Sequence, residues 1–166
     1  EPDPAIWVGE VATAARRINT ICNLGPLGVR VWGDEGWQQC ESHGVRYMGR
    51  ASHFEDLTSL YSNGGIHVDI GRVYQQDIVT MRVFDVLACG GFLLADPSDA
   101  LLELFEPGVE LETWSTLDEL VEKVRWYLEH PDKAAAIGKR GRERVLRDHG
   151  LRDRLRPMLA RLSGAP

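Results

Sequence analysis

The 166-residue sequence has few cysteines, no long apolar run and no excess of basic residues. Its three cysteines, Cys22, Cys40 and Cys89, are widely spaced and odd in number, which predicts neither a disulfide framework nor a zinc site. The apolar runs are too short for a membrane span, and the first residues do not resemble a cleavable targeting segment. The 19 Lys and Arg against 25 Asp and Glu give a net charge of −6, which argues against a nucleic-acid partner.

Several catalytic signatures are missing as well. No G-x-G-x-x-G follows an apolar run, so the phosphate turn of dinucleotide oxidoreductases is lacking. The stretch Gly138-Lys139-Arg140 is not the end of a P-loop, because Lys133 stands where that loop needs its first glycine. The serine-hydrolase motif G-x-S-x-G and the zinc motif H-E-x-x-H do not occur. No D-x-D pair is present, and we expect a site that needs neither a metal nor a cofactor.

What the sequence does contain is an alternation of short apolar runs and longer amphipathic segments. The short runs predict strands at 5–9, 29–33, 45–49, 66–70, 92–95 and 111–114. The amphipathic segments predict helices at 11–23, 37–41, 54–61, 78–89, 115–130, 132–148 and 151–162. Such alternation predicts an α/β fold: a Rossmann-like, mostly parallel sheet with helices on both faces. We expect one domain over 1–166, with 1–4 as a linker remnant and the C-terminal helices of 115–166 packed on it.

In open parallel sheets, ligands bind outside the carboxyl ends of the strands. The expected ends here are Gly9, Gly33, Gly49 with Arg50, the loop after the fourth strand, and Asp96. Glycine lets a ligand approach the backbone closely, although a glycine can also simply end a strand.

The predicted helix 78–89 is apolar nearly all round, and several of its few polar residues lie on one side. Arg82, Asp85 and Cys89 share one stripe, which indicates either a local Arg82–Asp85 ion pair or a polar ligand facing that stripe. Asp77, just before the helix, is a candidate N-cap. The free amides of this helix start would also suit a phosphate, with Arg72 and Arg82 adding charge-assisted hydrogen bonds.

The segment from Arg82 to Asp96, RVFDVLACGGFLLAD, resembles the signature of the spore-maturation (CgeB-like) glycosyltransferases, which are similar to the two-domain GT-B retaining enzymes. The resemblance continues through ELFEPG at 103–108, LDEL at 117–120, YLEHP at 127–131 and GRERVLRDH at 141–149. It covers roughly residues 5–150, in the order of the family.

The resemblance implies roles for particular residues. The family carries two glutamates eight positions apart, and Asp77 and Asp85 stand at the matching positions. Asp85 would accept hydrogen bonds from the ribose hydroxyls of a nucleotide sugar. Asp77, with Arg82, would lie at the reacting sugar and diphosphate. The further donor-binding candidates are Gly9, Arg16, Arg17, Gly49, Arg50, Arg72, Gln76 and Thr80.

The expected function follows from this resemblance. The chain would be the donor-binding half of a metal-independent glycosyltransferase that uses a UDP- or GDP-linked sugar, and it would lack an N-terminal acceptor domain. The alternative is a degenerate, non-catalytic module of the same fold, because both glutamates are shortened to aspartate. We expect a cytoplasmic location. The stretch 139–161 holds nine Lys and Arg against three acids, which is typical of a solvated helical face. The alternatives are contact with a missing partner domain and attachment to the anionic lipid of the inner membrane surface.

Overall fold

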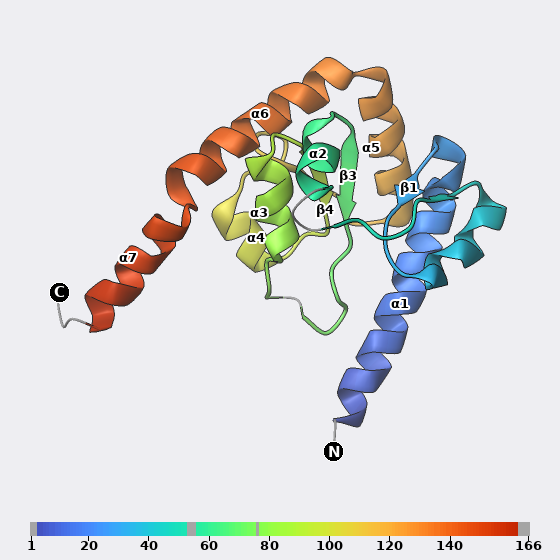
Figure 1. Ribbon diagram of the computed structural model, residues 1–166, viewed down its shortest axis with the longest axis horizontal. Helices are drawn as coiled ribbons and strands as arrows, with labels where there is room; N and C mark the ends of the chain where they lie inside the picture. The colour runs from blue at the N-terminus through green and yellow to red at the C-terminus, as the bar shows by residue number, and fades with distance from the viewer. Residues whose placement is uncertain (1–2, 53–55, 76, 163–166) are drawn as a thin grey trace.

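The computed structural model describes residues 3–52, 56–75 and 77–162 (Figure 1). Its strands form two parallel sheets. In the first, β1 (Arg30–Val31) pairs with β2 (Arg46–Tyr47); the second has the order β3 (Ile66–Asp69), β4 (Phe92–Ala95), β5 (Glu112–Thr113). Within the second sheet Asp69 lies opposite Ala95, so the carboxyl ends of β3 and β4 are level. The prediction of a Rossmann-like, parallel α/β fold is confirmed.

Helices make up most of the remaining chain. The α-helices, in chain order, are α1 (Pro4–Leu24), α2 (Leu57–Ser62), α3 (Met81–Ala88), α4 (Asp99–Leu104), α5 (Leu117–Glu129), α6 (Pro131–Asp148) and α7 (Leu151–Leu162). Two 3-10 helices, η1 (Gly25–Leu27) and η2 (Glu35–His43), lie on either side of β1. Within the described part of the chain, none of these helices is long and apolar enough to cross a membrane.

The predicted strand at 5–9 is wrong, because these residues form the start of α1. Asp3 caps the helix by accepting a hydrogen bond from the backbone N–H of Ala5 at 2.9 Å, and Pro4 occupies the first helical position. Thus 3–4 belong to the helix rather than to a linker, while 1–2 lie outside the described residues. Gly9 is not a strand end: it is buried in α1, where Tyr74 packs against its backbone.

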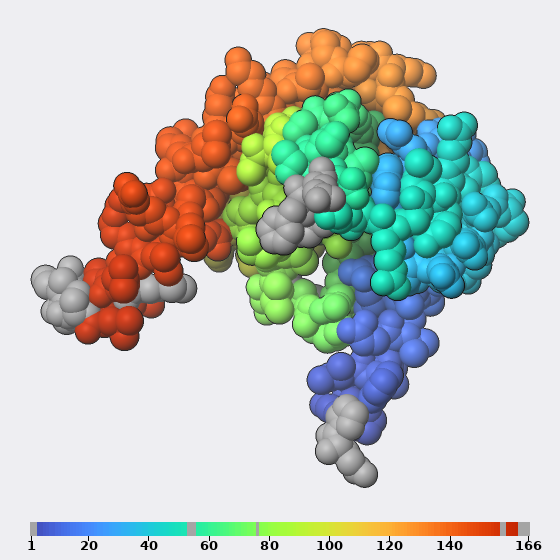
Figure 2. Space-filling model, in the orientation of Figure 1, coloured from blue at the N-terminus to red at the C-terminus, as the bar shows by residue number. Residues whose placement is uncertain are grey.

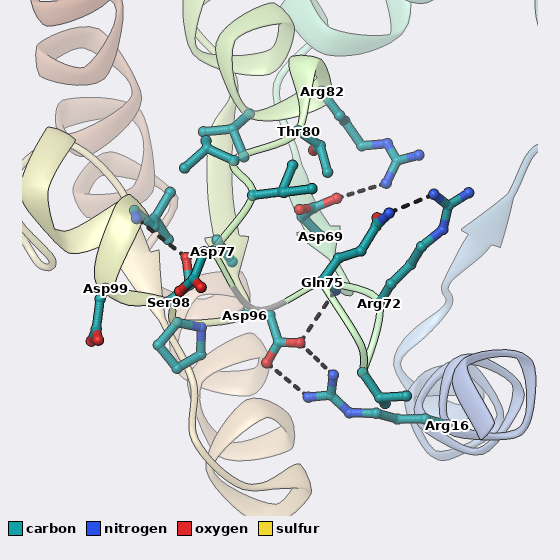
Figure 3. A pocket seen from close by; sticks show the side chains of 18 of the residues that line it. Arg16, Asp69, Arg72, Gln75, Asp77, Thr80, Arg82, Asp96, Ser98 and Asp99 are labelled. Carbon is teal, nitrogen blue, oxygen red and sulfur yellow. Dashed lines mark hydrogen bonds and ion pairs between the residues drawn. The ribbon is translucent and has the colours of Figure 1, made fainter. Parts of the chain in front are cut away.

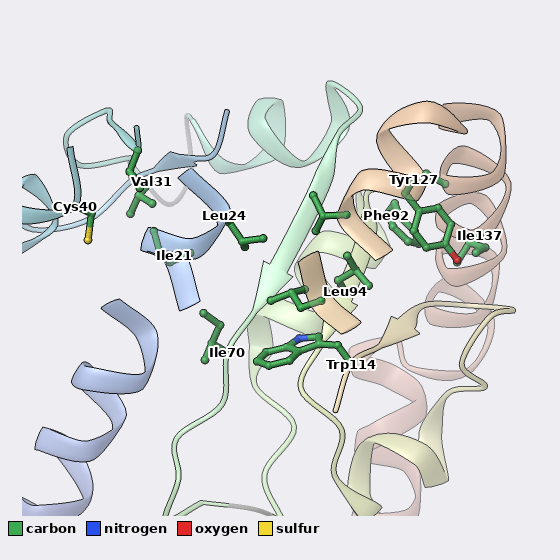
Figure 4. Packing of buried hydrophobic residues seen from close by; sticks show 14 residues of the cluster. Ile21, Leu24, Val31, Cys40, Ile70, Phe92, Leu94, Trp114, Tyr127 and Ile137 are labelled. Atoms are coloured by element: carbon green, nitrogen blue, oxygen red, sulfur yellow. The ribbon is translucent and has the colours of Figure 1, made fainter. Parts of the chain in front are cut away.

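Both faces of the second sheet are covered, as the alternating side chains of β4 show. Phe92 and Leu94 point into a core formed with α1, α5 and the start of α6 (Figure 4). Leu93 and Ala95 point into a second core formed with α3, α4 and the end of α6. All four side chains are buried, which explains why this strand is continuously apolar in sequence.

The C-terminal helices divide into two kinds. Helices α5 and α6 contribute buried residues to the two cores, among them Leu120, Ile137 and Val145. Helix α7 extends from the end of α6 at one side of the molecule (Figure 1), and its leucines are exposed. In Figure 2, α7 projects from the rest of the molecule.

Two partly buried histidines predict a loss of stability in acid. Burial lowers the pKa of His67, in β3, and of His149, at the end of α6, below the usual 6.5. The unfolded chain therefore binds protons first, so the free energy of unfolding should fall as pH drops below about 6.5, by up to about 1.4 kcal/mol per pH unit for His67 and by less for the more exposed His149. Urea unfolding of wild type and His67→Gln between pH 7 and 5 checks this. The variant should keep only the slope due to His149; an unchanged slope would contradict the role of His67.

Candidate functional site

A cavity of about 700 Å³ opens at the carboxyl ends of β3 and β4 (Figure 3). Its wall combines the middle of α1, the loop between β3 and α3, the first turn of α3, and the segment that joins β4 to α4. The polar and charged side chains that line it are Arg16, Arg17, Asp69, Arg72, Gln75, Asp77, Thr80, Arg82, Asp96, Ser98 and Asp99. The expectation that the site lies at this edge of the sheet matches the position of the cavity.

Arg16 is held across the cavity by Asp96. The two nitrogens at the end of its guanidinium donate to the two carboxylate oxygens of Asp96, one of them at 2.7 Å, in a bidentate pair. These hydrogen bonds raise the pKa of Arg16, and the guanidinium also lies 5.2 Å from the ring centroid of Trp114. Asp96 further accepts the backbone N–H of Gly71 at 3.2 Å, which ties α1 and the loop after β3 to the end of β4.

Arg82 is held by a second acid, Asp69, at the end of β3. Its Nη1 donates to Oδ1 of Asp69 at 2.6 Å. The carboxylate is buried, whereas 51% of the Arg82 side chain is exposed, and Arg82 lines the cavity. The expected local ion pair between Arg82 and Asp85 is replaced by this longer-range pair with Asp69.

Arg17 lies among other cations. Its Nε and Nη2 donate to the carbonyl oxygen of Ile70 at 3.2 and 2.9 Å, which is a neutral partner. Burial, together with the positive charges of Arg82 and Arg72, lowers the pKa of Arg17. The cavity wall also carries Asp69, Asp77, Asp96 and Asp99. An anion bound near Arg17 would relieve the repulsion that it feels from Arg82 and Arg72.

The loop after β3 is fixed to α1 at its outer side. Arg72 donates to Oε1 of Gln75 at 3.2 Å and forms an ion pair with Glu10 at 3.5 Å. The hydroxyl of Thr13 accepts the backbone N–H of Val73 at 3.2 Å, and Tyr74 donates to Glu10. These contacts set the loop that carries Arg72 beside the cavity before any ligand binds.

The helix that begins at the cavity is shorter than the sequence indicates. Thr80 is the N-cap of α3, so the prediction that Asp77 caps this helix is wrong. Asp77 lies three residues earlier, exposed, on the cavity wall. The hydroxyl oxygen of Thr80 is buried and has no hydrogen-bond partner among the described residues, which leaves a polar group available at the helix start.

The predicted site residues therefore separate into groups. Those that the structure brings together on the cavity wall are Arg16, Arg17, Arg72, Asp77, Thr80 and Arg82. Those that do not line it are Gly9, Gly49, Arg50 and Asp85. Gln76 lies outside the described residues. The arginines of α1 reach the site from mid-helix rather than from a glycine turn, because the predicted first strand is helical.

Asp85 lies one turn beyond Arg82 on α3 and is half-buried. Burial raises the pKa of the Tyr61 hydroxyl; the charge of Arg82 opposes this rise and that of Asp85 adds to it. The charge of Asp85 thus acts on Tyr61 of α2, away from the residues that line the cavity. Gly49, whose φ of +78° suits glycine, and the exposed Arg50 follow β2 in the other sheet.

Sequence reasoning placed Asp96 at the ligand edge but did not foresee that acids hold the arginines there. Asp69 and Asp96 hold Arg82 and Arg16, and Ser98 and Asp99 complete the wall at α4. The sequence did contain a signal for these acids. Asp69 ends β3 and Asp96 directly follows β4, and the carboxyl ends of neighbouring parallel strands meet at one edge of a sheet. No group of three or more acidic, histidine or cysteine side chains suited to a metal ion occurs among the residues that the structure describes.

The protein is a parallel α/β fold with a cavity at the carboxyl ends of its strands, where such folds bind ligands. The chain belongs to the glycosyl transferase-like family, whose model matches residues 11–160. An uncharacterized protein from Aquifex aeolicus (strain VF5) is 27% identical over 145 residues, which is 86% of this chain.

The fold is also similar to solved structures. The crystal structure of Anabaena HepE in complex with UDP-glucose matches with a TM-score of 0.59 and 16% identity over 78% of this chain. HepE in complex with UDP and glucose matches with a TM-score of 0.61 and 16% identity over 79%. The chain spans 35% of the Aquifex protein and 39% and 40% of these two HepE chains. At such low identity the HepE structures show a similar fold.

Proposed function

We propose that this chain is the donor-binding half of a metal-independent glycosyltransferase and that its cavity holds the diphosphate of a nucleotide sugar. The observation that carries the proposal is the convergence of Arg16, Arg17, Arg72 and Arg82 on one cavity at the carboxyl edge of the sheet. Family membership gives the reaction class, and the complexes of HepE with UDP-glucose and UDP support the choice of ligand.

Glycosyl transfer from a nucleotide sugar requires positive charge beside the diphosphate. In glycosyl transfer the bond between the anomeric carbon and the diphosphate oxygen breaks, and its electron pair stays on the diphosphate. A hydroxyl oxygen of the acceptor bonds to the carbon and loses its proton. Guanidinium groups fixed in advance stabilise the negative charge as it develops, without a metal. Arg82, fixed by Asp69 and still half-exposed, is the group best placed for this role.

Of the finer assignments, that of Asp77 is supported by its placement, whereas those of Asp85 and the base rest on the family resemblance. Asp77 stands on the cavity wall, where it can contact the sugar. Asp85 would take the ribose hydroxyls if the nucleoside extends past Arg82 toward Tyr61, with the base near the segment Gly49–Ser52. The membership in the CgeB-like subgroup, and an acceptor domain in the remaining part of a longer protein, belong to this proposal as well.

Calorimetric titration of the chain with UDP, GDP, ADP and their sugar derivatives tests the proposal. We expect weak binding of one nucleotide series, unchanged by EDTA, and little or no turnover by this chain alone. Arg125→Gln, which removes an exposed charge from α5, is a matched control and should bind as the wild type does. No heat change with any of these ligands at millimolar concentration would overturn the proposal.

A second candidate function is a non-catalytic module, which the two aspartates in place of glutamates favour. Restoring the longer side chains separates the two functions. In the double variant Asp77→Glu/Asp85→Glu, a working site should bind nucleotide several-fold more tightly, because a glutamate reaches one methylene further toward the ribose and sugar hydroxyls. A vestigial site should show no change. Asp118→Glu on α5 controls for a general effect of the substitution.

A further inference from the structure

Helix α7 carries a row of exposed leucines along one side. Leu151, Leu155, Leu159 and Leu162 are spaced by four, four and three residues, so they share one face of the helix. Their exposed fractions are 77%, 43%, 61% and 84%. Figure 2 shows α7 projecting at one side of the molecule.

Arginines flank the leucine row on both sides. At 100° per residue Arg152 and Arg156 fall on one side of the row and Arg154 and Arg161 on the other, while Asp153 lies opposite the leucines. The described part of α7 thus has four cations against one acid in a chain whose net charge is −6. This is the distribution of a helix that lies in a membrane interface, with its leucines in the acyl boundary and its arginines at the headgroups.

The first turn of α7 contacts the rest of the domain. The guanidinium of Arg154 lies 4.3 Å from the ring centroid of Phe84 in α3, and its Nη2 is 3.5 Å from Nδ1 of His149. The basic character continues into α6, where Lys139, Arg140 and Arg147 are exposed. The positive surface therefore extends from the end of α6 along α7.

We propose that α7 docks this protein on an anionic lipid surface. The choice of a lipid surface rests on charge complementarity, because arginines beside a leucine row suit anionic phosphate headgroups. The proposal is independent of what the cavity binds, because none of the residues of α7 lines the cavity.

Vesicle sedimentation of the 166-residue chain tests this. With phosphatidylglycerol and phosphatidylcholine in about equal amounts, we expect partitioning at least about tenfold stronger than with phosphatidylcholine alone, weakening as salt is raised. The double variant Leu151→Asp/Leu162→Asp should lose at least about tenfold, since it removes two apolar contacts and adds two negative charges. Leu102→Asp/Leu128→Asp, at exposed positions on α4 and α5, is the matched control and should partition as the wild type does.

A second pair of variants tests the charges. Arg152→Gln/Arg161→Gln should weaken partitioning by roughly twentyfold, because each arginine near an anionic surface contributes roughly a fivefold factor. Arg125→Gln/Lys133→Gln, on α5 and α6, should lose much less. Equal binding to neutral vesicles, equal losses in the control variants, or no sedimentation at low salt would each overturn the proposal. The last outcome would favour a protein partner on the leucine row.

Discussion

Replacing Arg82 with methionine is expected to weaken nucleoside diphosphate binding by about ten- to a hundredfold. The exposed nitrogens of its guanidinium would otherwise make charge-assisted hydrogen bonds, each contributing about 1.5–3 kcal/mol. The same change leaves the buried carboxylate of Asp69 without its 2.6 Å partner, so we also expect the free energy of unfolding to fall by about 2 kcal/mol. Calorimetric titration measures the first effect and urea unfolding the second.

A double variant separates the two effects. In Asp69→Asn/Arg82→Met the buried charge is removed along with its partner, so stability should return most of the way to that of the wild type. Binding should stay as weak as in the single variant, because the cation that meets the diphosphate is still missing. Arg125→Met is the control for loss of a surface charge. If Arg82→Met binds nucleotide as the wild type does, Arg82 only holds the sheet edge together and the diphosphate lies elsewhere.

Replacing Gly141 with alanine should destabilise the protein by about 2–3 kcal/mol, although alanine is the better helix former by about 1 kcal/mol. A Cβ at this position of α6 would lie 2.3 Å from the carbonyl oxygen of Glu110 and 2.7 Å from Cδ2 of Leu87. Helix α6 would have to move away from α3 and β4, against which it packs. Thermal unfolding should show a midpoint lowered by roughly 4–12 °C for a domain of this size.

The control for this prediction is Ala135→Gly, at an exposed position of the same helix. It should lose only about 1 kcal/mol, since the cost there is helix propensity alone. Gly138→Ala should resemble Gly141→Ala, because its Cβ would lie 2.6 Å from the carbonyl oxygen of Gly90. A midpoint for Gly141→Ala at or above that of the wild type would show that α6 can shift at little cost.

The elements predicted correctly are those whose signals are local. Strand β4 is apolar at all four positions, as a parallel strand buried on both faces must be. Helix α5 begins with a capping box: Thr116 accepts the backbone N–H of Glu119 at 3.2 Å, and the Glu119 carboxylate accepts the backbone N–H of Ser115 at 2.8 Å. Each of these signals lies within a few residues of the element that it sets.

The start of the chain was predicted wrongly because the apolar run 5–9 does not by itself distinguish a strand from a helix. A strand needs a neighbour with which to pair, whereas the cap supplied by Asp3 and the continuing helical face of Thr13, Thr20 and Ile21 extend α1 back to Pro4. The start of α3, beside the cavity, was also predicted at the wrong residue, and for a related reason. Asp77 has the right side chain for a cap, but the chain turns into α3 only at Thr80.

The sequence by itself determined most of the order of strands and helices after α1, the family resemblance and the presence of arginines near the expected ligand edge. Only the tertiary structure decided which of those arginines converge and which acids hold them. Arg16 meets Asp96 across 80 positions of sequence, and Arg82 turns from Asp85 on its own helix to Asp69 on the neighbouring strand. The physical reason is that a long side chain takes the partner that packing brings within reach, and parallel strands bring distant residues to one edge.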